Sequence, residues 1–444
     1  MKRVASLALG LGVGLGAAQA QTSWQRLSLE LRGESPVPEQ ASDPAQAFQL
    51  VQRQMRLLLD SDGRFRLTTE SVYPGPVRFN FMELGAATTG SATLDLLKWR
   101  NGTEITRKTP EALKADLAEL QFLTPALLKQ RIEASASGAE IEVLDSAGRR
   151  ASLRRDPATG ELLSARSASG VLYEYADYQG LPSGLSQPRQ ISEKRGEVLR
   201  VRWQVTASDL DRSDGRAFDL PAGYVEPVVD AQGLRATPIA PGSYRIDGSA
   251  SRYHSSFSIG SQGIVVFDAP VSADEARRVR ALIEKLAPGR PVTHAVVSHA
   301  HRDHVAGLPV YFGEGVQILA GRNARLALQR QHGAELASKV VEVLEARELD
   351  LGDRRIKLMP LPSSHASDML VAYDGASRAL FQGDLFYIPD VGPVPPAFAM
   401  AAELQALIKD QALQVDWIVG VHGRSGTTAE LAEGLRLMQR QQAR

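Results

Sequence analysis

The chain contains no cysteine among its 444 residues. Disulfide bonds, a cysteine nucleophile and a lipid-anchored cysteine after a leader sequence are therefore excluded. The sequence also lacks a G-x-S-x-G motif, which argues against a serine hydrolase. We expect the fold to be stabilised by its hydrophobic cores and by any bound metal.

The chain has no excess of either charge, because 51 Lys and Arg residues balance 51 Asp and Glu residues. It has no basic block and no basic stripe studded with aromatic residues, which argues against a nucleic-acid-binding protein and weakens the case for an RNA-processing nuclease. A length of 444 residues allows two domains with sizeable cores.

Residues 1–20 resemble a cleavable signal peptide. Lys2 and Arg3 precede an apolar stretch that ends near Ala17, and Ala18-Gln19-Ala20 fits an A-x-A cleavage site. The stretch is short for a membrane-spanning helix, although an uncleaved anchor is the alternative. We expect a periplasmic or secreted protein, and no other segment approaches the length of a membrane span.

Four side chains of metal-binding type lie within six residues, 299–304, shortly after the apolar run Ala295-Val296-Val297. They are His299, His301, Asp303 and His304, in the pattern H-x-H-x-D-H. A single histidine is more often a structural residue, but this density at the end of a predicted strand predicts a metal site. Imidazoles with a carboxylate suit zinc first, and iron or manganese second.

This motif resembles that of the metallo-β-lactamase superfamily. The resemblance implies three further ligands at the ends of later strands, and this chain has a matching residue for each: His365, Asp384 and His422. Gly307 and the strand that ends at Asp268 also match the family. A possible capping box at Ser272 and Glu275 opens a predicted helix that ends before Pro288-Gly289.

The resemblance covers about residue 236 to the C-terminus and implies an αββα sandwich. Ser364 departs from the family, which commonly has glycine at this position. Asp384 makes the chain less similar to the class B β-lactamases, which generally lack this aspartate. The chain is more similar to the broader branch of hydrolases that includes glyoxalase II.

By position, the resemblance implies that His299, His301 and His365 hold one metal. Asp303, His304 and His422 would hold the second, and Asp384 would bridge the two. Two Zn²⁺ ions held in this way would generate a bridging hydroxide near neutral pH. Asp303 has a second implied role, in which it orients that hydroxide.

The remaining candidates are less specific. His254 and Arg424 are candidate substrate contacts, but an exposed hairpin histidine and an ordinary surface arginine are equally good interpretations. We interpret His294 and His332 as structural residues.

Residues 21–225 are predicted to form a mostly antiparallel β domain. Predicted strands cover 55–59, 64–68, 141–144, 151–153, 162–163, 171–175 and 198–205, separated by glycine-rich and aspartate-rich turns. One helix is expected after Thr109-Pro110 and another begins at Thr124-Pro125. This domain weakly resembles the half-barrel of periplasmic lipoprotein carriers, which implies an apolar or lipid ligand, although a spacer or dimerisation module is the alternative.

The predicted organisation is a signal peptide (1–20), the β domain (21–225), a linker (226–235) and a hydrolase domain (236–444), with an α+β fold overall. The predicted function is that of an exported binuclear zinc hydrolase that cleaves an ester, thioester, amide or lactam bond in a small-molecule substrate. One alternative is an oxidoreductase similar to the mononuclear iron persulfide dioxygenases. Another is a non-catalytic periplasmic binding protein. The sequence identifies neither the substrate nor the oligomeric state.

Overall fold

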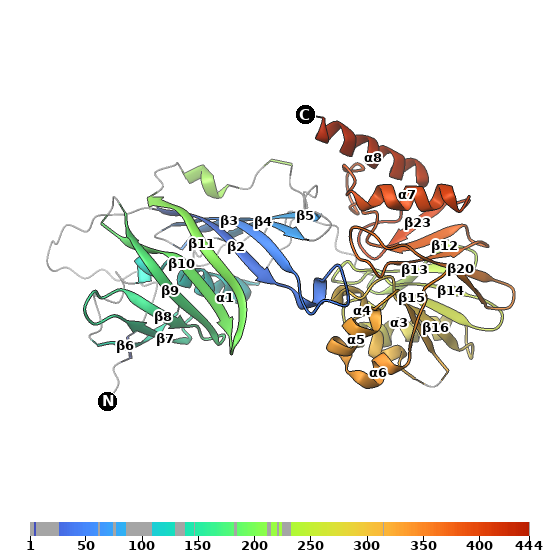
Figure 1. The fold of residues 1–444 in the computed structure, drawn as a ribbon, viewed down its shortest axis with the longest axis horizontal. Coiled ribbons are helices and arrows are strands. Elements are labelled where there is room, and N and C mark those ends of the chain that lie inside the picture. The colour runs from blue at the N-terminus through green and yellow to red at the C-terminus, as the bar shows by residue number, and fades with distance from the viewer. Residues whose placement is uncertain are drawn as a thin grey trace. The chain divides into compact units, whose positions relative to one another are not determined.

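A computed structural model describes two compact units of the chain. The described residues are 4–5, 26–60, 63–73, 77–85, 109–128, 138–145, 147–181, 184–210, 215–219, 222–223, 232–313 and 315–443. The first unit contains Met1–Pro36, Leu50–Tyr73 and Arg78–Pro227, and the second contains Val37–Gln49, Pro74–Val77 and Val228–Arg444. The fold is α+β, as the sequence predicted (Figure 1). Apart from Val4–Ala5, the predicted signal peptide lies outside the described residues, and the predicted domain boundaries stay predictions.

The first unit is built on an 11-stranded sheet with the order β1-β6-β7-β8-β9-β10-β11-β2-β3-β4-β5. From β6 to β4 in that order, each neighbouring pair is antiparallel. The predicted meander is therefore confirmed. The strands are β1 (Val4–Ala5), β2 (Arg26–Pro36), β3 (Leu50–Asp60), β4 (Phe65–Tyr73), β5 (Val77–Gly85), β6 (Glu140–Leu144), β7 (Arg150–Arg155), β8 (Leu162–Arg166), β9 (Val171–Gly180), β10 (Ser186–Arg195) and β11 (Val198–Leu210).

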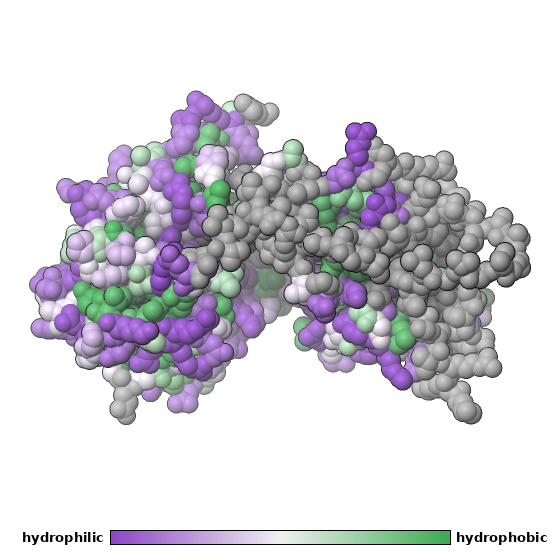
Figure 2. Space-filling model, turned by 180° about the vertical axis from the view of Figure 1, so that it is seen from behind, coloured by the Kyte–Doolittle hydropathy of each residue, from purple (hydrophilic) through white to green (hydrophobic). Residues whose placement is uncertain are grey.

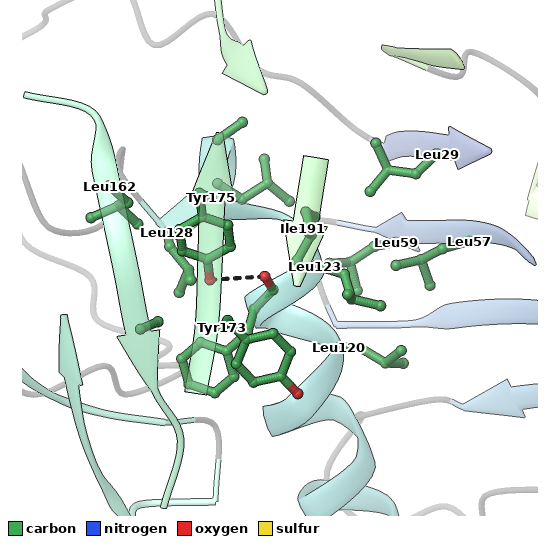
Figure 3. Close-up of a cluster of buried hydrophobic side chains, with 14 of the residues drawn as sticks. Leu29, Leu57, Leu59, Leu120, Leu123, Leu128, Leu162, Tyr173, Tyr175 and Ile191 are labelled. Carbon is green, nitrogen blue, oxygen red and sulfur yellow. Dashed lines mark hydrogen bonds between the residues drawn. The ribbon is translucent and has the colours of Figure 1, made fainter. Parts of the chain in front are cut away.

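The predicted helical insert packs against the apolar face of this sheet (Figure 3). The Thr109 hydroxyl caps α1 (Pro110–Leu120), η2 (Gln121–Leu123) follows, and residues 125–128 are helical. The Tyr175 hydroxyl donates to the Phe122 carbonyl oxygen at 2.9 Å, which satisfies a buried polar group at the contact. The short helix η3 (Gly215–Phe218) comes after β11. A ligand for this unit remains a prediction.

The second unit contains two sheets. The seven-stranded sheet has the order β12 (Arg235–Ala240), β13 (Ser243–Asp247), β14 (Ser256–Ile259), β15 (Ile264–Phe267), β16 (Val292–Val296), β17 (Gln317–Ala320) and β18 (Val340–Glu342). The five-stranded sheet has the order β19 (Arg347–Asp350), β20 (Arg355–Pro360), β21 (Leu370–Asp374), β22 (Ala379–Gly383) and β23 (Trp417–Gly420). β15 to β18 are parallel, as are β22 and β23.

The sheets pack face to face because alternate residues of each strand point in opposite directions. In β15, Val265 and Phe267 contact the five-stranded sheet, where Phe267 stacks on Phe381 at 3.9 Å between ring centroids. Ile264 and Val266 instead pack among residues of the helices that cover the outer side. This arrangement is the predicted αββα sandwich.

Helices cover both outer faces of the sandwich (Figure 1). They are α3 (Ala273–Leu286), α4 (Arg302–Val305), η4 (Leu308–Tyr311), α5 (Ala324–His332), α6 (Ala334–Ser338), α7 (Met400–Asp410) and α8 (Thr428–Gln442). α3 begins where predicted, and the Ser272 hydroxyl accepts from the Glu275 amide at 3.2 Å. The expected capping box is incomplete, because the Glu275 carboxylate instead accepts a hydrogen bond from Ser249.

The surface of the second unit is largely hydrophilic on the face that Figure 2 shows, with apolar side chains in patches among the polar ones. The exposed large apolar residues of the second unit lie at separate places along the chain: Phe48, Leu286, Leu326, Leu344, Val391 and Trp417. Within the described parts of the chain, no helix combines the length and the apolar character that crossing a membrane requires.

The buried carboxylate of Asp374 joins the two sheets. Asp374, at the end of β21, is fully buried and pairs with Arg354. The same carboxylate accepts hydrogen bonds from Ser243 of β13 at 2.6 Å and Ser258 of β14 at 2.9 Å. Burial by itself would raise the pKa of Asp374, but the serine hydroxyls and the guanidinium outweigh it and lower the pKa.

We expect Asp374→Ala to lower the free energy of unfolding by about 3–5 kcal/mol, because it leaves a buried guanidinium without its partner. Glu348→Ala is the control, since the Glu348–Arg355 pair is largely exposed and should contribute less than about 1 kcal/mol. The folded pKa of Asp374 is depressed, so its contribution is present above the unfolded pKa of about 3.9 and is lost as the pH falls through the folded value. Urea unfolding measures the free energy of unfolding of both variants. An equally small loss in both would contradict the role of Asp374 in joining the sheets.

Candidate metal centre

The seven side chains predicted as metal ligands come together at one edge of the sandwich. His299 and His301 follow β16, and Asp303 and His304 lie in α4. The other three come from the five-stranded sheet, where His365 lies between β20 and β21, Asp384 follows β22 and His422 follows β23. The carboxyl ends of neighbouring parallel strands lie at the same edge of a sheet, which is why residues far apart in sequence meet here.

The side chains form two groups. His299, His301 and His365 make the first group, and Asp303, His304, Asp384 and His422 make the second. Within each group, the ligand atoms all lie within 4.8 Å of one another. Each group therefore has the dimensions of a single metal site.

The first group presents three imidazole nitrogens to one point. His299 Nε2 lies 2.9 Å from His301 Nδ1 and 3.0 Å from His365 Nε2. A tetrahedral ion with metal–nitrogen distances of about 2.0–2.1 Å separates its ligands by about 3.3 Å, close to this spacing. Burial, reinforced by the neighbouring histidines, lowers the pKa of His299 well below its ordinary value and that of His301 to about 3. The group is thus neutral and suited to bind a cation.

The second group combines imidazoles with carboxylates. His422 Nε2 lies 3.3 Å from Asp303 Oδ2 and 3.3 Å from Asp384 Oδ1, while His304 Nε2 lies 3.1 Å from Asp384 Oδ1. Burial alone would lower the pKa of both imidazoles. The carboxylates outweigh burial, raising the pKa of His304 well above its ordinary value and that of His422 to about 9.

Asp384 lies between the groups. Its Oδ1 faces His304 and His422 of the second group, and its Oδ2 lies 3.5 Å from His365 Nε2 of the first group. A carboxylate that presents one oxygen to each group has the geometry of a bridging ligand.

Two buried atoms of the second group show that its residues fit a metal ion. His304 Nε2 and Asp384 Oδ1 are buried, and apart from their ion-pair contacts within this group they have no hydrogen-bond partner among the described residues. A buried polar atom with no partner at all costs about 1–3 kcal/mol, and here no atom outside the group would compete with a cation for these two atoms.

Surrounding side chains hold the ligands in place. Asp268, which the family resemblance singled out, accepts from the Ser298 amide at 2.7 Å and from His304 Nδ1 at 3.2 Å. This leaves the His304 Nε2 lone pair free for a metal. Sequence reasoning missed Asp368, which accepts from the Ala300 amide at 2.8 Å and whose pKa burial raises to about 7.

A glycine is required beside α4. A Cβ atom at Gly307 would lie 2.8 Å from the Ser272 carbonyl oxygen and 2.9 Å from the Ala276 Cβ. The glycine of the D-H-x-x-G pattern therefore allows α3 to approach the metal loop.

The two candidate substrate-binding residues, His254 and Arg424, both form hydrogen bonds within the protein. His254 is buried, and its Nδ1 donates to the Ile246 carbonyl oxygen at 2.8 Å. Arg424 pairs with Glu430 at 2.7 Å, inside the reciprocal capping box of α8. Both residues have structural partners, and a role for either in substrate binding stays a prediction.

Neither of the two remaining histidines belongs to the metal groups. His294 lies in β16 beside the Thr293 hydroxyl, and His332 ends α5. A residue that sequence reasoning did not single out, Tyr253, packs its ring edge-on against His422, with 4.5 Å between centroids.

Comparisons with known proteins agree with this architecture. Residues 252–422 match the model of the metallo-beta-lactamase superfamily. This match, together with the two groups of His and Asp side chains, supports a metal-dependent enzyme. No curated protein gives a significant match to the chain.

Several solved structures are similar to the chain. A metallo-beta-lactamase from Pontibacter korlensis is 19% identical, with a TM-score of 0.39, over 46% of this chain and 99% of that one. A stereoselective inverting sec-alkylsulfatase from Pseudomonas sp. is 15% identical, with a TM-score of 0.37, over 45% of this chain and 41% of that one. The flavodiiron protein from Giardia intestinalis is 19% identical, with a TM-score of 0.39, over 46% of this chain and 59% of that one.

We expect the purified protein to bind two metal ions per chain, because the two groups are separately complete. His365→Ala should abolish binding at the first group and keep part of the binding at the second. Elemental analysis of the wild type and the variant measures both. A single iron as the only metal of the wild type would contradict this expectation.

Metal binding should release protons from the second group only. Near pH 7 the raised pKa values keep His304 and His422 protonated, so an ion must displace both protons, whereas the first group has none to lose. Affinity at the second group should therefore weaken as the pH falls below about 9, while affinity at the first changes little near neutrality. Calorimetric zinc titrations in buffers of different ionisation enthalpy count these protons, and equal release at both steps would contradict the assignment.

Proposed function

We propose that this protein is an exported binuclear zinc hydrolase that cleaves an ester, thioester, amide or lactam bond of a small molecule. The observation that carries the proposal is the position of Asp384, whose two oxygens face different ligand groups. A single-metal enzyme would have no need of the complete second group.

Zinc is the proposed metal because neutral imidazoles and carboxylates are among its preferred ligands. When bound, two such ions acidify water and polarise a carbonyl group. The protein itself keeps three imidazoles neutral in the first group, and it places two carboxylates against His304 and His422 in the second group. No serine or cysteine nucleophile is needed for this chemistry.

Asp303 is proposed both to bind the second metal and to orient the attacking water. Its Oδ2 faces His422 at 3.3 Å and His304 at 3.8 Å. Its pKa is lowered because these two imidazoles outweigh the effect of burial, which keeps the side chain an acceptor near neutral pH.

The proposed location is the periplasm or the cell exterior. The support is the sequence of residues 1–20, with its basic start, apolar core and A-x-A site. Fractionating cells that express the protein and sequencing its N-terminus tests this. Recovery from the cytoplasm, with the N-terminus still at Met1, would contradict it.

The hydrolase activity can be tested with zinc-loaded protein and a panel of lactams, thioesters, lactones and phosphodiesters. We expect turnover of at least one carbonyl substrate, and its loss in Asp384→Ala. Turnover of a persulfide with consumption of oxygen, and of no hydrolase substrate, would support the dioxygenase alternative instead.

Asp303→Asn keeps the size of the side chain and one coordinating oxygen but removes the charge. At saturating zinc we expect kcat to fall on the order of a hundredfold, because the nucleophile is no longer aligned. Metal content should fall less than turnover. His294→Asn is the matched control and should turn over at the wild-type rate per folded molecule. Wild-type kcat in Asp303→Asn with both metals bound would show that Asp303 is a ligand only.

A further inference from the structure

The connection between β2 and β3 contributes directly to the metal centre. Residues Val37–Gln49 join two strands of the first sheet, yet they belong to the second compact unit. They begin with η1 (Pro38–Gln40), and in Figure 1 this blue segment lies beside α4 and α5. Here it is called the 37–49 segment.

The segment hydrogen-bonds to His301. The Ala41 carbonyl oxygen lies 3.2 Å from His301 Nε2. A carbonyl only accepts, so this contact places the imidazole proton on Nε2 and leaves the Nδ1 lone pair free. Nδ1 is the atom that lies 2.9 Å from His299 Nε2 in the first group. The Ala41 carbonyl therefore selects the tautomer that a metal needs.

A second contact is made to Asp303. Gln40 Nε2 donates to Asp303 Oδ1 at 2.7 Å. The other oxygen, Oδ2, is the one that faces His422 and His304. The amide thus occupies one oxygen of the carboxylate and directs the other toward the second group.

Other contacts anchor the segment independently of the ligands. Arg330 of α5 donates to the Pro44 carbonyl oxygen at 2.6 Å and to the Gln46 carbonyl oxygen at 2.7 Å. The Ser367 amide donates to the Ser42 carbonyl oxygen at 2.7 Å.

Contacts inside the segment and at its base also limit its freedom. The Gln49 side chain accepts from the Ser42 amide at 2.8 Å, and the Val37 amide donates to the Gln49 carbonyl oxygen at 2.8 Å. The segment is therefore fixed at both ends and along its length, as precise ligand placement requires.

We propose that the 37–49 segment is a positioning element of the metal centre, with Gln40 as the positioning residue for Asp303. Gln40 acts on the second group through Asp303, and the Ala41 carbonyl acts on the first group through His301. The inference rests on the proposed function only in taking these side chains as metal ligands. Outer partners of this kind commonly change metal affinity by about 10- to 100-fold.

Two variants of Gln40 in the full-length protein test the proposal. Gln40→Met removes the donor and keeps the length of the side chain. Gln40→Glu keeps the shape but sets a charged acceptor against Asp303. Gln52→Met, on an exposed position of β3, is the control. The readouts are stepwise Zn²⁺ affinity by chelator competition and the visible spectrum of the Co²⁺-substituted protein.

We expect Gln40→Met to weaken binding of the second ion by about tenfold and Gln40→Glu to weaken it further. Binding of the first ion should be unchanged in both variants. Relative to the wild type, the Co²⁺ bands of the second site should shift in both Gln40 variants and stay unchanged in Gln52→Met. A role limited to packing predicts instead that the isosteric Glu variant behaves like the wild type.

Wild-type affinity and spectrum in both Gln40 variants would overturn the proposal, as would equal weakening of both ions. The proposal would also be overturned if the wild type bound a single ion and Asp303 were not among the ligands of that ion. Failure of the hydrolase proposal is recognisable separately, because the wild type would then bind two ions, respond to the Gln40 variants as expected and hydrolyse no substrate.

Discussion

Five imidazoles and two carboxylates share one largely desolvated space in this protein, and that crowding is the constraint on which the rest of the centre depends. Buried charges are costly unless they are paired, and buried neutral imidazoles are costly when their lone pairs face one another. The two groups meet this constraint in different ways. Burial, reinforced by the neighbouring imidazoles, keeps His299 and His301 neutral, whereas Asp303 and Asp384 keep His304 and His422 charged. Two cations would relieve both situations at once.

The two sheets of the second unit must hold these side chains close together although, without a metal, the imidazole lone pairs repel one another. The ligands come from both sheets, so the sheets have to keep a fixed relation to one another. Stacking of Phe267 on Phe381 acts between the sheets, as do the hydrogen bonds that the buried Asp374 carboxylate accepts from Ser243 and Ser258. Removal of either contact would change the spacing of the ligands as well as the stability of the sandwich.

The 37–49 segment extends the same principle to a distant part of the chain. Gln40 and Asp303 are 263 residues apart in sequence. Their contact means that the centre depends on residues outside the stretch that matches the family model, which begins at residue 252.

The sequence by itself determined the first ligand motif and most strands of the meander, because these depend on local patterns, whereas the sandwich and the three later ligands were implied by the resemblance to the metallo-β-lactamase superfamily. The run from His299 to His304 is dense enough to be recognised without neighbours, and alternating apolar residues mark the strands. Only the tertiary structure decided which residues support the ligands. Asp368 and Gln40 have no local pattern that distinguishes them from ordinary polar residues, and the partners of His254, Arg424 and Glu275 were equally hidden. Their roles arise from hydrogen bonds between segments far apart in the chain, and a hydrogen bond depends on distance and direction in space, which no spacing along a sequence encodes.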